Sequence, residues 1–373
     1  MLKVLTVFGT RPEAIKMAPV IAELERQGGR ILNRNCFTGQ HRDMVQSLLH
    51  LFDIRVDFDL DLMRENQTLD YMTTRVLEEV GRILRSEDFD YVLVQGDTTT
   101  SMAAGLAAFY RGVKIGHVEA GLRTYDKTQP YPEEVNRRII DAMSDLYFAH
   151  TDHARDNLLR EGIAAAQIEV TGNTVIDALM DVAGRDYAFT DRTLQDLSRD
   201  PRKIVLVTAH RRESFGEQFE SICAGLKELA LRHHDEIVIV YPVHRNPNVR
   251  KVVGAMLANL DNVVLLDPLD YVPFVHLMKK SYLVLTDSGG LQEEAPSLDK
   301  PVLVLRKVTE RQEGVAAGTI RLVGTDTAEI VAEASRLLTD RRAYDEMASK
   351  PNPYGDGTAA AKTVRRILAE APG

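Results

Sequence analysis

The chain has 373 residues, of which 44% are hydrophobic and 27% charged, so it can bury a large core and is too long for one ordinary doubly wound domain. Its formal net charge of -9 excludes an overall basic field that would bind nucleic acid, and basic residues must act locally. Only two distant cysteines occur, Cys36 and Cys223, which excludes a disulfide framework or cysteine-based zinc site and favours a reducing cytoplasm.

The N-terminal apolar run is short and reaches an Arg-Pro-Glu sequence within about a dozen residues, unlike a signal peptide. No later window approaches the roughly 20 apolar residues of a membrane span. We therefore expect a soluble protein without a membrane partner.

Short apolar, β-branched segments alternate with amphipathic helical patterns along the whole chain. This alternation predicts an α/β fold with parallel sheets covered by helices on both faces. The predicted strands are residues 4–8, 91–95, 114–118, 146–149, 204–208, 237–241, 263–266, 283–286 and 302–305.

A polar stretch between the two sets of strands places the linker within residues 171–201. It separates a first Rossmann-like domain, residues 1–172, from a second, residues 173–356. After a breaker at residues 351–355, apolar residues at helical spacing predict a last helix over residues 358–370 that must dock on another element.

Ligands of parallel sheets bind beyond the carboxyl ends of the strands, so candidate site residues directly follow strands. After the first strand, Pro12 suits an early helical position, and Arg11 and Lys16 lie in the first turns of the helix. Together with the helix N-terminus they predict a local anion site. Two surface cations on an ordinary strand-turn-helix would give the same pattern.

Acidic residues follow two neighbouring strands of the first domain. Asp97 and Glu119 lie at these ends, and because two carboxylates at adjacent edges repel, structure alone seldom requires them. Asp97 could instead be a helix N-cap. Glu133 and Glu134 open a later helix, where pairing with the helix dipole explains an acid, and for Glu134 we favour that role.

In the second domain, His210, Arg211 and Arg212 follow the first strand and predict a phosphate-facing cluster, although His210 could be a packing histidine.

Farther along, the backbone amides of Ser288, Gly289 and Gly290 would bind a diphosphate. Glu294, one turn into the following helix, is placed to accept the hydroxyls of a ribose, or lies on an ordinary solvated helix face. Arg311, on an irregular segment, could contact base or phosphate.

Several catalytic motifs are missing from the sequence. No Gly-x-Gly-x-x-Gly follows a strand, and there is no Gly-x-x-x-x-Gly-Lys-Ser/Thr, His-Glu-x-x-His or Gly-x-Ser-x-Gly. We therefore expect no nicotinamide, metal or other cofactor, and no serine nucleophile.

Ten segments spread along the chain carry a resemblance: FGTRPEAIKMAP, TGQHR, QGDTTTS, GHVEAGLRT, PEEVNRR, TGNTVIDAL, HRRESFG, YPVHRNPNV, LTDSGGLQEEAPSL and NPYGDG. Together they resemble the non-hydrolysing UDP-N-acetylglucosamine (UDP-GlcNAc) 2-epimerases. The resemblance implies two facing Rossmann-like domains, as in glycosyltransferases of the B type, with the last helix, about residues 357–373, packed on the first domain. It also implies a homodimer that interconverts UDP-GlcNAc and UDP-ManNAc for cell-surface polysaccharides.

The resemblance also implies roles for individual residues. Catalysis would fall to Asp97, Glu119, Glu133 and His210. Phe274, which the pattern alone would place in the core, would join the substrate site. The implied substrate-binding residues are Arg11, Lys16, Asp97, Glu119, His210, Leu269, Phe274, Ser288, Gly289, Gly290, Glu294 and Arg311.

Some positions bear on regulation or depart from the family pattern. Leu269 stands where a Gln is frequent, so a contact there would come from its backbone. Some bacterial members are activated by a second substrate molecule, and Gln40, His41, Arg211 and His244 match part of that surface.

Without a nicotinamide the second sugar carbon cannot be transiently oxidised, so we expect elimination of UDP to a 2-acetamidoglucal, followed by re-addition. Three alternatives remain open. A hydrolysing relative would release ManNAc and UDP, a glycosyltransferase would need an acceptor, and a sugar-nucleotide sensor would bind without turnover.

Overall fold

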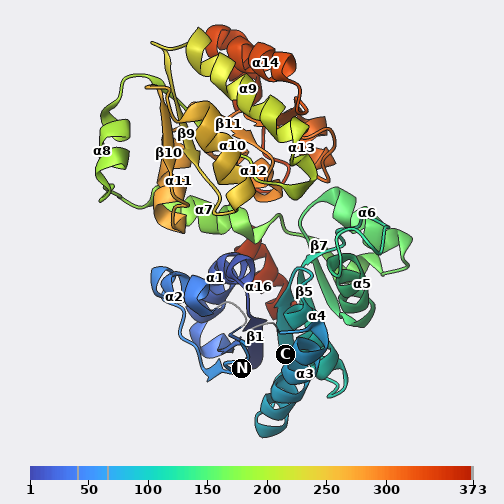
Figure 1. The fold of residues 1–373 in the computed structure, drawn as a ribbon. Coiled ribbons are helices and arrows are strands. Elements are labelled where there is room, and N and C mark those ends of the chain that lie inside the picture. Colours follow the sequence, from blue (N-terminus) through green and yellow to red (C-terminus); the bar gives the residue numbers. More distant parts are fainter. Residues whose placement is uncertain (40–41, 65–66, 371–373) are drawn as a thin grey trace. The chain divides into compact units, whose positions relative to one another are not determined.

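The computed structural model describes residues 1–39, 42–64 and 67–370. It divides into two compact units, Met1–Ala178 with Tyr354–Gly373, and Leu179–Pro353 (Figure 1). Each unit contains one sheet whose strands all run parallel. The predicted α/β fold with two parallel sheets is confirmed.

The first unit holds a seven-stranded sheet with β1 near its centre. Apolar residues of β1 are buried on both faces, as expected when helices cover a parallel sheet: Val4 and Leu5 have no exposed surface. In sheet order the strands are β3 (Phe58–Asp59), β2 (Ile31–Phe37), β1 (Leu2–Phe8), β4 (Tyr91–Gln95), β5 (Lys114–Ala120), β6 (Leu146–Ala149) and β7 (Ile168–Val170).

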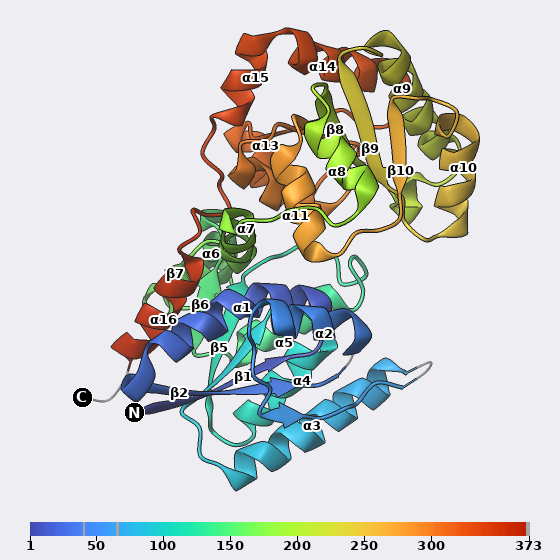
Figure 2. The same ribbon diagram turned by 90° about the vertical axis from the view of Figure 1, so that its left-hand side faces the viewer.

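Helices cover both faces of this sheet, and Figure 2 shows α1 and α3 on opposite sides. Leu5 and Val7 of β1 pack with Val76 of α3 and Ala103 of α4 in one apolar cluster. The helices of this unit are α1 (Arg11–Arg26), α2 (Arg42–Leu51), α3 (Leu69–Ser86), α4 (Thr99–Phe109), α5 (Glu133–Met143), α6 (Asp152–Arg160) and α16 (Ala359–Ala369). Helix α7 (Thr174–Gly184) begins in the first unit and ends in the second.

The last helix, α16, lies against α1 of the first unit. Asp177 of α7 accepts hydrogen bonds from the amides of Ala359 and Ala360, at 3.2 and 2.8 Å, and so caps the start of α16. Val364 and Ile367 are buried beneath it. A capped N-terminus and an apolar face together hold this helix in place.

The second unit holds a six-stranded sheet. Its largest apolar cluster joins the sheet to α9 and α14, with Val205, Leu226 and Ile330 among its fully buried members. The strands in sheet order are β10 (Val263–Leu266), β9 (Ile237–Pro242), β8 (Lys203–Thr208), β11 (Leu283–Thr286), β12 (Val302–Val304) and β13 (Ile320–Leu322). The helices are α8 (Arg192–Arg199), α9 (Glu217–Arg232), α10 (Pro247–Leu257), α11 (Tyr271–Lys280), α12 (Gly289–Glu294), α13 (Gln312–Ala317), α14 (Thr327–Thr339) and α15 (Arg341–Ala348).

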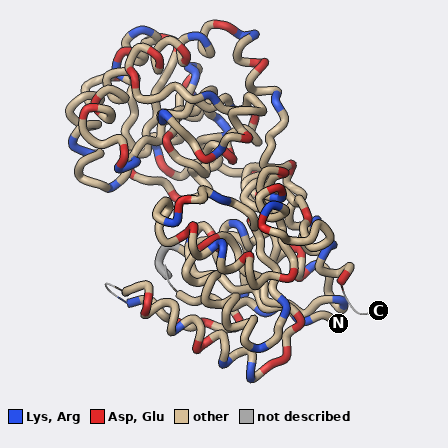
Figure 3. Tube along the Cα trace, turned by 90° about the vertical axis from the view of Figure 1, so that its right-hand side faces the viewer, with Lys and Arg blue, Asp and Glu red and all other residues tan. Residues whose placement is uncertain are grey.

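Basic and acidic residues are interleaved along the trace of both units, as Figure 3 shows. Over the described residues, no helix combines the length and the apolar character that a membrane crossing needs.

Candidate functional site

The predicted acids of the first unit come together because β4 and β5 are hydrogen-bonded neighbours. Asp97 follows β4, and Glu119 is the second-last residue of β5, at the same edge of the sheet. The loop after β1 completes this edge, since β1 pairs with β4 on its other side. The adjacency expected from the sequence pattern is present in the structure.

Glu119 lies at an irregularity in the β5–β6 pairing, and its φ of 69° is in the left-handed region. A non-glycine residue in this region costs about 1 to 3 kcal/mol and persists only where its surroundings hold it. Here Lys16 Nζ lies 2.5 Å from Glu119 Oε2, and the side-chain amide of Gln95 donates to the same oxygen. The irregular strand end thus aims this carboxylate at Lys16.

Asp97 is held by two residues of α5. Arg137, which is almost fully buried, forms an ion pair with the Asp97 carboxylate, and the Asn136 side chain donates to the Asp97 carbonyl at 3.0 Å. Each of the two predicted acids therefore has its own cation, which relieves the repulsion between them. Sequence reasoning missed Arg137, although it lies four residues after Glu133 and hence on the same side of the helix.

Glu133 and Glu134 begin α5 but have different surroundings. Glu134 is fully buried and accepts from the amides of Thr124 and Tyr125, both at 3.0 Å, so it holds the preceding loop as a structural residue. Glu133 Oε2 is also buried, yet within the described residues it has no hydrogen-bond partner. A buried carboxylate oxygen without a partner is costly and is a mark of a functional group.

Glu13 is a central residue of this edge that sequence reasoning did not single out. Its side chain is fully buried, and one oxygen accepts from the amides of Gly9 and Thr10, at 3.1 and 2.7 Å. The other accepts from the hydroxyls of Thr98 and Ser101, at 2.7 and 3.0 Å. Glu13 thus ties the loop after β1 to the loop after β4, and its capping-box spacing from Thr10 was the signal for it.

The predicted anion site at the start of α1 is partly occupied by the chain's own groups. Glu13 takes two of the amides, and Lys16 is paired with Glu119. Arg11, the first residue of α1, makes no ion pair with any described residue and is partly exposed. Of the three predicted elements of this site, Arg11 is the one available to an anionic ligand.

In the second unit, the buried carboxylate of Asp287 organises the strand ends. Its Oδ2 accepts from the amides of His210 and Arg211, at 2.6 and 2.7 Å, which joins the loop after β8 to the loop after β11. Beneath it, the hydroxyls of Thr208 and Thr286 are 2.6 Å apart. Asp287 lies in the motif LTDSGGLQEEAPSL, but sequence reasoning predicted no role for it.

The His210 ring stacks on His244, with ring centroids 5.0 Å apart and planes 10° from parallel. Burial lowers the pKa of His210, and the neighbouring His244 and Arg211 add to this, whereas the Asp287 carboxylate 3.6 Å from Nδ1 opposes it. A neutral ring can act as a hydrogen-bond donor or exchange a proton without carrying a fixed charge. Arg211 and His244, the described members of the predicted regulatory set, both lie beside His210.

Ser288 is the N-cap residue of α12, where no side chain caps the helix, and its own amide donates to Thr286 Oγ1 at 2.9 Å. The prediction that the Ser288 amide would bind a diphosphate is therefore wrong, and the nest consists of the amides of Gly289 and Gly290. A Cβ atom on Gly290 would lie 3.2 Å from Glu294 Oε1, and one on Gly289 would lie 3.3 Å from Arg311 Cζ. The predicted nest of amides, the predicted ribose acceptor and the predicted base or phosphate contact are therefore neighbours.

Two acids fix the position of Arg311. Its Nε is 2.7 Å from Glu293, which is buried, and its Nη1 is 3.2 Å from Glu310. Arg306 pairs with Glu310 as well, at 2.9 Å. Burial would raise the pKa of Glu310, but Arg311 and Arg306 lower it, so it is ionised at neutral pH. The sequence did not indicate these supporting acids.

The remaining predicted site residues are placed as follows. Phe274 is partly buried on α11, and Leu269 is partly buried in the loop before it. Gln40 and His41 lie outside the described residues.

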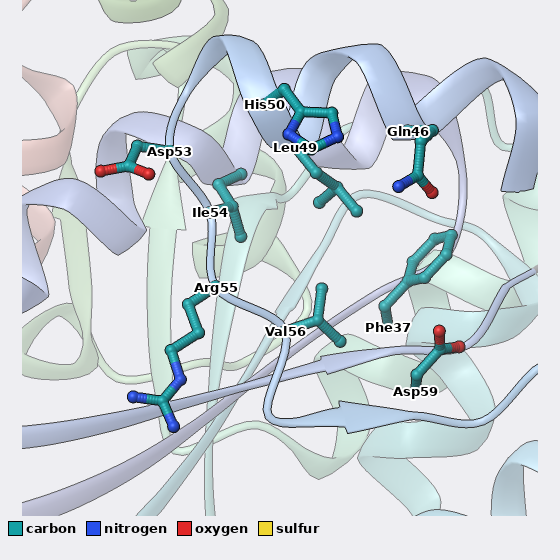
Figure 4. Close-up of a pocket in the computed structure, with 9 residues that line it drawn as sticks. All are labelled: Phe37, Gln46, Leu49, His50, Asp53, Ile54, Arg55, Val56 and Asp59. Atoms are coloured by element: carbon teal, nitrogen blue, oxygen red, sulfur yellow. The ribbon is translucent and has the colours of Figure 1, made fainter.

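A cavity of about 320 Å³ lies beside α2 in the first unit. Figure 4 shows Gln46, Leu49 and His50 of α2 facing Phe37 and Asp59 from the strands. None of the predicted site residues lines it, so cavity shape alone would point away from the acids.

Comparison with known proteins agrees with the motifs. A family model described as UDP-N-acetylglucosamine 2-epimerase matches residues 22–368. The UDP-N-acetylglucosamine 2-epimerase of Escherichia coli (strain K12) is 51% identical over 373 residues, covering 98% of each chain. The crystal structure of UDP-GlcNAc 2-epimerase from Neisseria meningitidis bound to UDP-GlcNAc has a TM-score of 0.87 and 47% identity, over 99% of this chain and 100% of that one. The enzyme from Methanocaldococcus jannaschii has a TM-score of 0.84 and 31% identity, over 99% and 100% of the chains.

Two parallel-sheet units with acids at one set of strand ends, taken with these matches, define an isomerase. The chain belongs to the UDP-N-acetylglucosamine 2-epimerase family, as its sequence motifs predicted.

Proposed function

We propose that the chain interconverts UDP-GlcNAc and UDP-ManNAc by eliminating UDP and adding it back. The observation that carries this proposal is the group of three acids in the first unit: Asp97 and Glu119 end adjacent strands, and Glu133 begins the helix whose Arg137 holds Asp97. Proton transfer at both faces of a sugar carbon needs at least one base and one acid, and this edge supplies carboxylates for both.

The reaction balances without a cofactor. A carboxylate removes the proton from the second sugar carbon, and the electrons of that C–H bond form a double bond to the first carbon. The bond from the first carbon to the diphosphate oxygen breaks, and the electrons of that bond leave with UDP. The product is 2-acetamidoglucal. In the second half, a diphosphate oxygen adds to the first carbon and a carboxyl group returns a proton to the opposite face of the second. We assign this work to Asp97, Glu119 and Glu133 as a set.

The second unit supplies groups that suit UDP. The amides of Gly289 and Gly290, the Ser288 hydroxyl and the Arg311 guanidinium would stabilise the charge of the leaving diphosphate. Glu294 would accept hydrogen bonds from the ribose hydroxyls, and His210 would donate a hydrogen bond to the diphosphate. Phe274 would pack against the nucleotide. Arg11 would add a cation from the first unit.

Proton NMR of the enzyme with UDP-GlcNAc in heavy water tests the reaction. UDP-ManNAc carrying deuterium at the inverted carbon supports epimerisation through deprotonation. Free ManNAc plus UDP would instead indicate a hydrolysing enzyme, and an unchanged spectrum would favour an acceptor-dependent transferase or a sensor.

We propose in addition that the chain acts in the cytoplasm, where it supplies ManNAc-type sugars for the synthesis of cell-surface polysaccharides.

We also propose that the chain forms a homodimer. Helices α4 and α5 contact each other, and apolar residues on them or directly after α4 are exposed: Phe109, Tyr110, Val135 and Ile139. Light scattering on the purified chain checks the oligomer, and Ile139→Glu should weaken it.

The position of Arg211 and His244 beside His210 supports regulation by a second substrate molecule. Sigmoidal dependence of rate on UDP-GlcNAc concentration, lost in His244→Ala, is the expected behaviour.

A further inference from the structure

A network of four ionisable residues, three of them buried, lies next to the backbone that carries Asp97 and Glu119. His117 of β5 and Arg123 both contact the Asp141 carboxylate, at 2.6 and 2.7 Å, and Arg123 also contacts Glu161 at 2.7 Å. The side chains of His117 and Arg123 have no exposed surface, and Asp141 is 2% exposed. None of these four residues carries a role in the reaction proposed above.

The contacts of this network reach the backbone next to Asp97 and the backbone next to Glu119. His117 Nε2 lies 2.7 Å from the carbonyl oxygen of Gly96, the residue directly before Asp97. Asp141 accepts from the amide of Gly121, two residues after Glu119, at 3.3 Å. One buried carboxylate therefore contacts, directly or through one imidazole, the backbone beside both acids.

The hydrogen bonds decide the protonation of His117. The Gly96 carbonyl can only accept, so Nε2 must carry a proton. Burial would raise the pKa of Asp141, but the facing His117 and Arg123 lower it below its ordinary value, so Asp141 is ionised. Its carboxylate lies 2.6 Å from Nδ1, so the His117 ring bridges Asp141 and the Gly96 carbonyl.

We propose that His117 is a positioning residue, held by the Asp141 carboxylate, that fixes the backbone of Gly96 and thereby the place of Asp97 relative to Glu119. This inference rests on the roles proposed for Asp97 and Glu119. A buried ion pair that served stability alone would have no reason to contact both loops.

Two substitutions separate positioning from stability. Gln places its side-chain amide near the position of Nε2, and Asn places its amide near that of Nδ1. His117→Gln therefore keeps the donor to Gly96 and loses the contact with Asp141, whereas His117→Asn does the reverse. Both lose the ring, so both should lower the melting temperature by similar amounts.

We expect His117→Asn to lower kcat about 100-fold with KM almost unchanged, because a misplacement of about 1 Å at the reacting groups has this effect. His117→Gln should lose about 10-fold or less. Equal losses of kcat in the two variants, or losses confined to KM, would overturn the proposal.

Nitrogen NMR of the histidine-labelled wild-type enzyme gives a second readout. The His117 signals, assigned by their absence from His117→Gln, should show a proton on Nε2, and a ring without a proton on Nε2 would contradict the inference. Asp97→Asn is measured in parallel. If it keeps wild-type turnover, the proposed role of Asp97 fails; if it is inactive while His117→Asn is fully active, only the positioning role fails.

Discussion

The two units have the same parallel-sheet architecture but different chemistry where their strands end. In the first unit, carboxylates point from neighbouring strand ends, each paired with a cation: Asp97 with Arg137 and Glu119 with Lys16. In the second unit, the central carboxylate, Asp287, faces inward and holds two backbone amides. The same position in the fold thus presents cation-paired carboxylates, the proton-transfer groups we propose, in one unit and a buried carboxylate that holds backbone in the other.

The difference suggests a division of labour in which the first unit performs the chemistry and the second holds UDP. Substitutions in the first unit should therefore change kcat, and substitutions at the second unit's strand ends should change nucleotide affinity.

The largest effect is expected for Glu119→Gln and Asp97→Asn. Each removes a carboxylate from the acidic edge, and loss of acid–base catalysis should lower kcat about 1000-fold. The affinity for UDP, measured by calorimetry, should stay within about 2-fold of wild type because the groups proposed to bind UDP, Arg11 apart, lie in the other unit. Asp156→Asn, on the exposed side of α6, is the control and should leave both values unchanged. A drop in UDP affinity as large as the drop in kcat would refute the division of labour.

Glu133→Gln should lower kcat about 100-fold and keep nucleotide binding. The substitution keeps the shape of the side chain but replaces a carboxylate oxygen that is buried without a hydrogen-bond partner among the described residues. Steady-state kinetics together with UDP calorimetry checks this. Unchanged turnover would remove Glu133 from the chemical step and leave Asp97 and Glu119 as the pair.

Gly290→Ala tests the second unit and should weaken UDP binding about 10-fold, with a smaller change in kcat. The added Cβ would lie 3.2 Å from Glu294 Oε1 and would displace the proposed ribose acceptor from beside the amide nest. Gly254→Ala on α10 is a matched control, because its Cβ would meet no atom within 4 Å. If both variants bind UDP equally well, the nest is not the diphosphate site.

Long, apolar strands were predictable from the sequence, and β2 shows why others were not. Its centre reads Asn33-Arg34-Asn35, which is unlike a buried strand. The structure satisfies these amides through side chains: Thr6 donates to Asn33 at 2.9 Å, and Asn33 donates to Asn35 at 2.8 Å. Such a polar ladder depends on a neighbouring strand that periodicity does not reveal. The strands β3, β7 and β13 have two or three residues, which is too short for a periodic signal, and each contains a charged residue. Strand β12 is equally short, but it is entirely apolar and was predicted.

For the candidate site, the rule that ligand groups follow parallel strands found the acids but not what orients them. The capping-box spacing of Glu13 was visible in the sequence, whereas its bonds to Thr98 and Ser101 require the β1–β4 pairing. The irregular strand end at Glu119 likewise comes from the sheet, because no local pattern predicts a left-handed glutamate.

The smallest expected effect uses the two cysteines, one in each unit, as reporters. Cys36 of β2 and Cys223 of α9 are both buried, and burial raises the pKa of Cys223 to about 12 and also raises that of Cys36, so neither is a reactive thiolate at pH 8 in the folded chain. Labelling by a thiol reagent therefore measures opening of the unit that holds each cysteine.

UDP at three times its Kd should slow labelling of Cys223, measured in Cys36→Ala, about 4-fold, because a ligand of the second unit stabilises that unit by mass action. Cys36, measured in Cys223→Ala, should be slowed less than about 2-fold if UDP is bound mainly by the second unit. Equal protection of both cysteines would mean that the two units open together or share UDP evenly, and either result would end the division of labour between them.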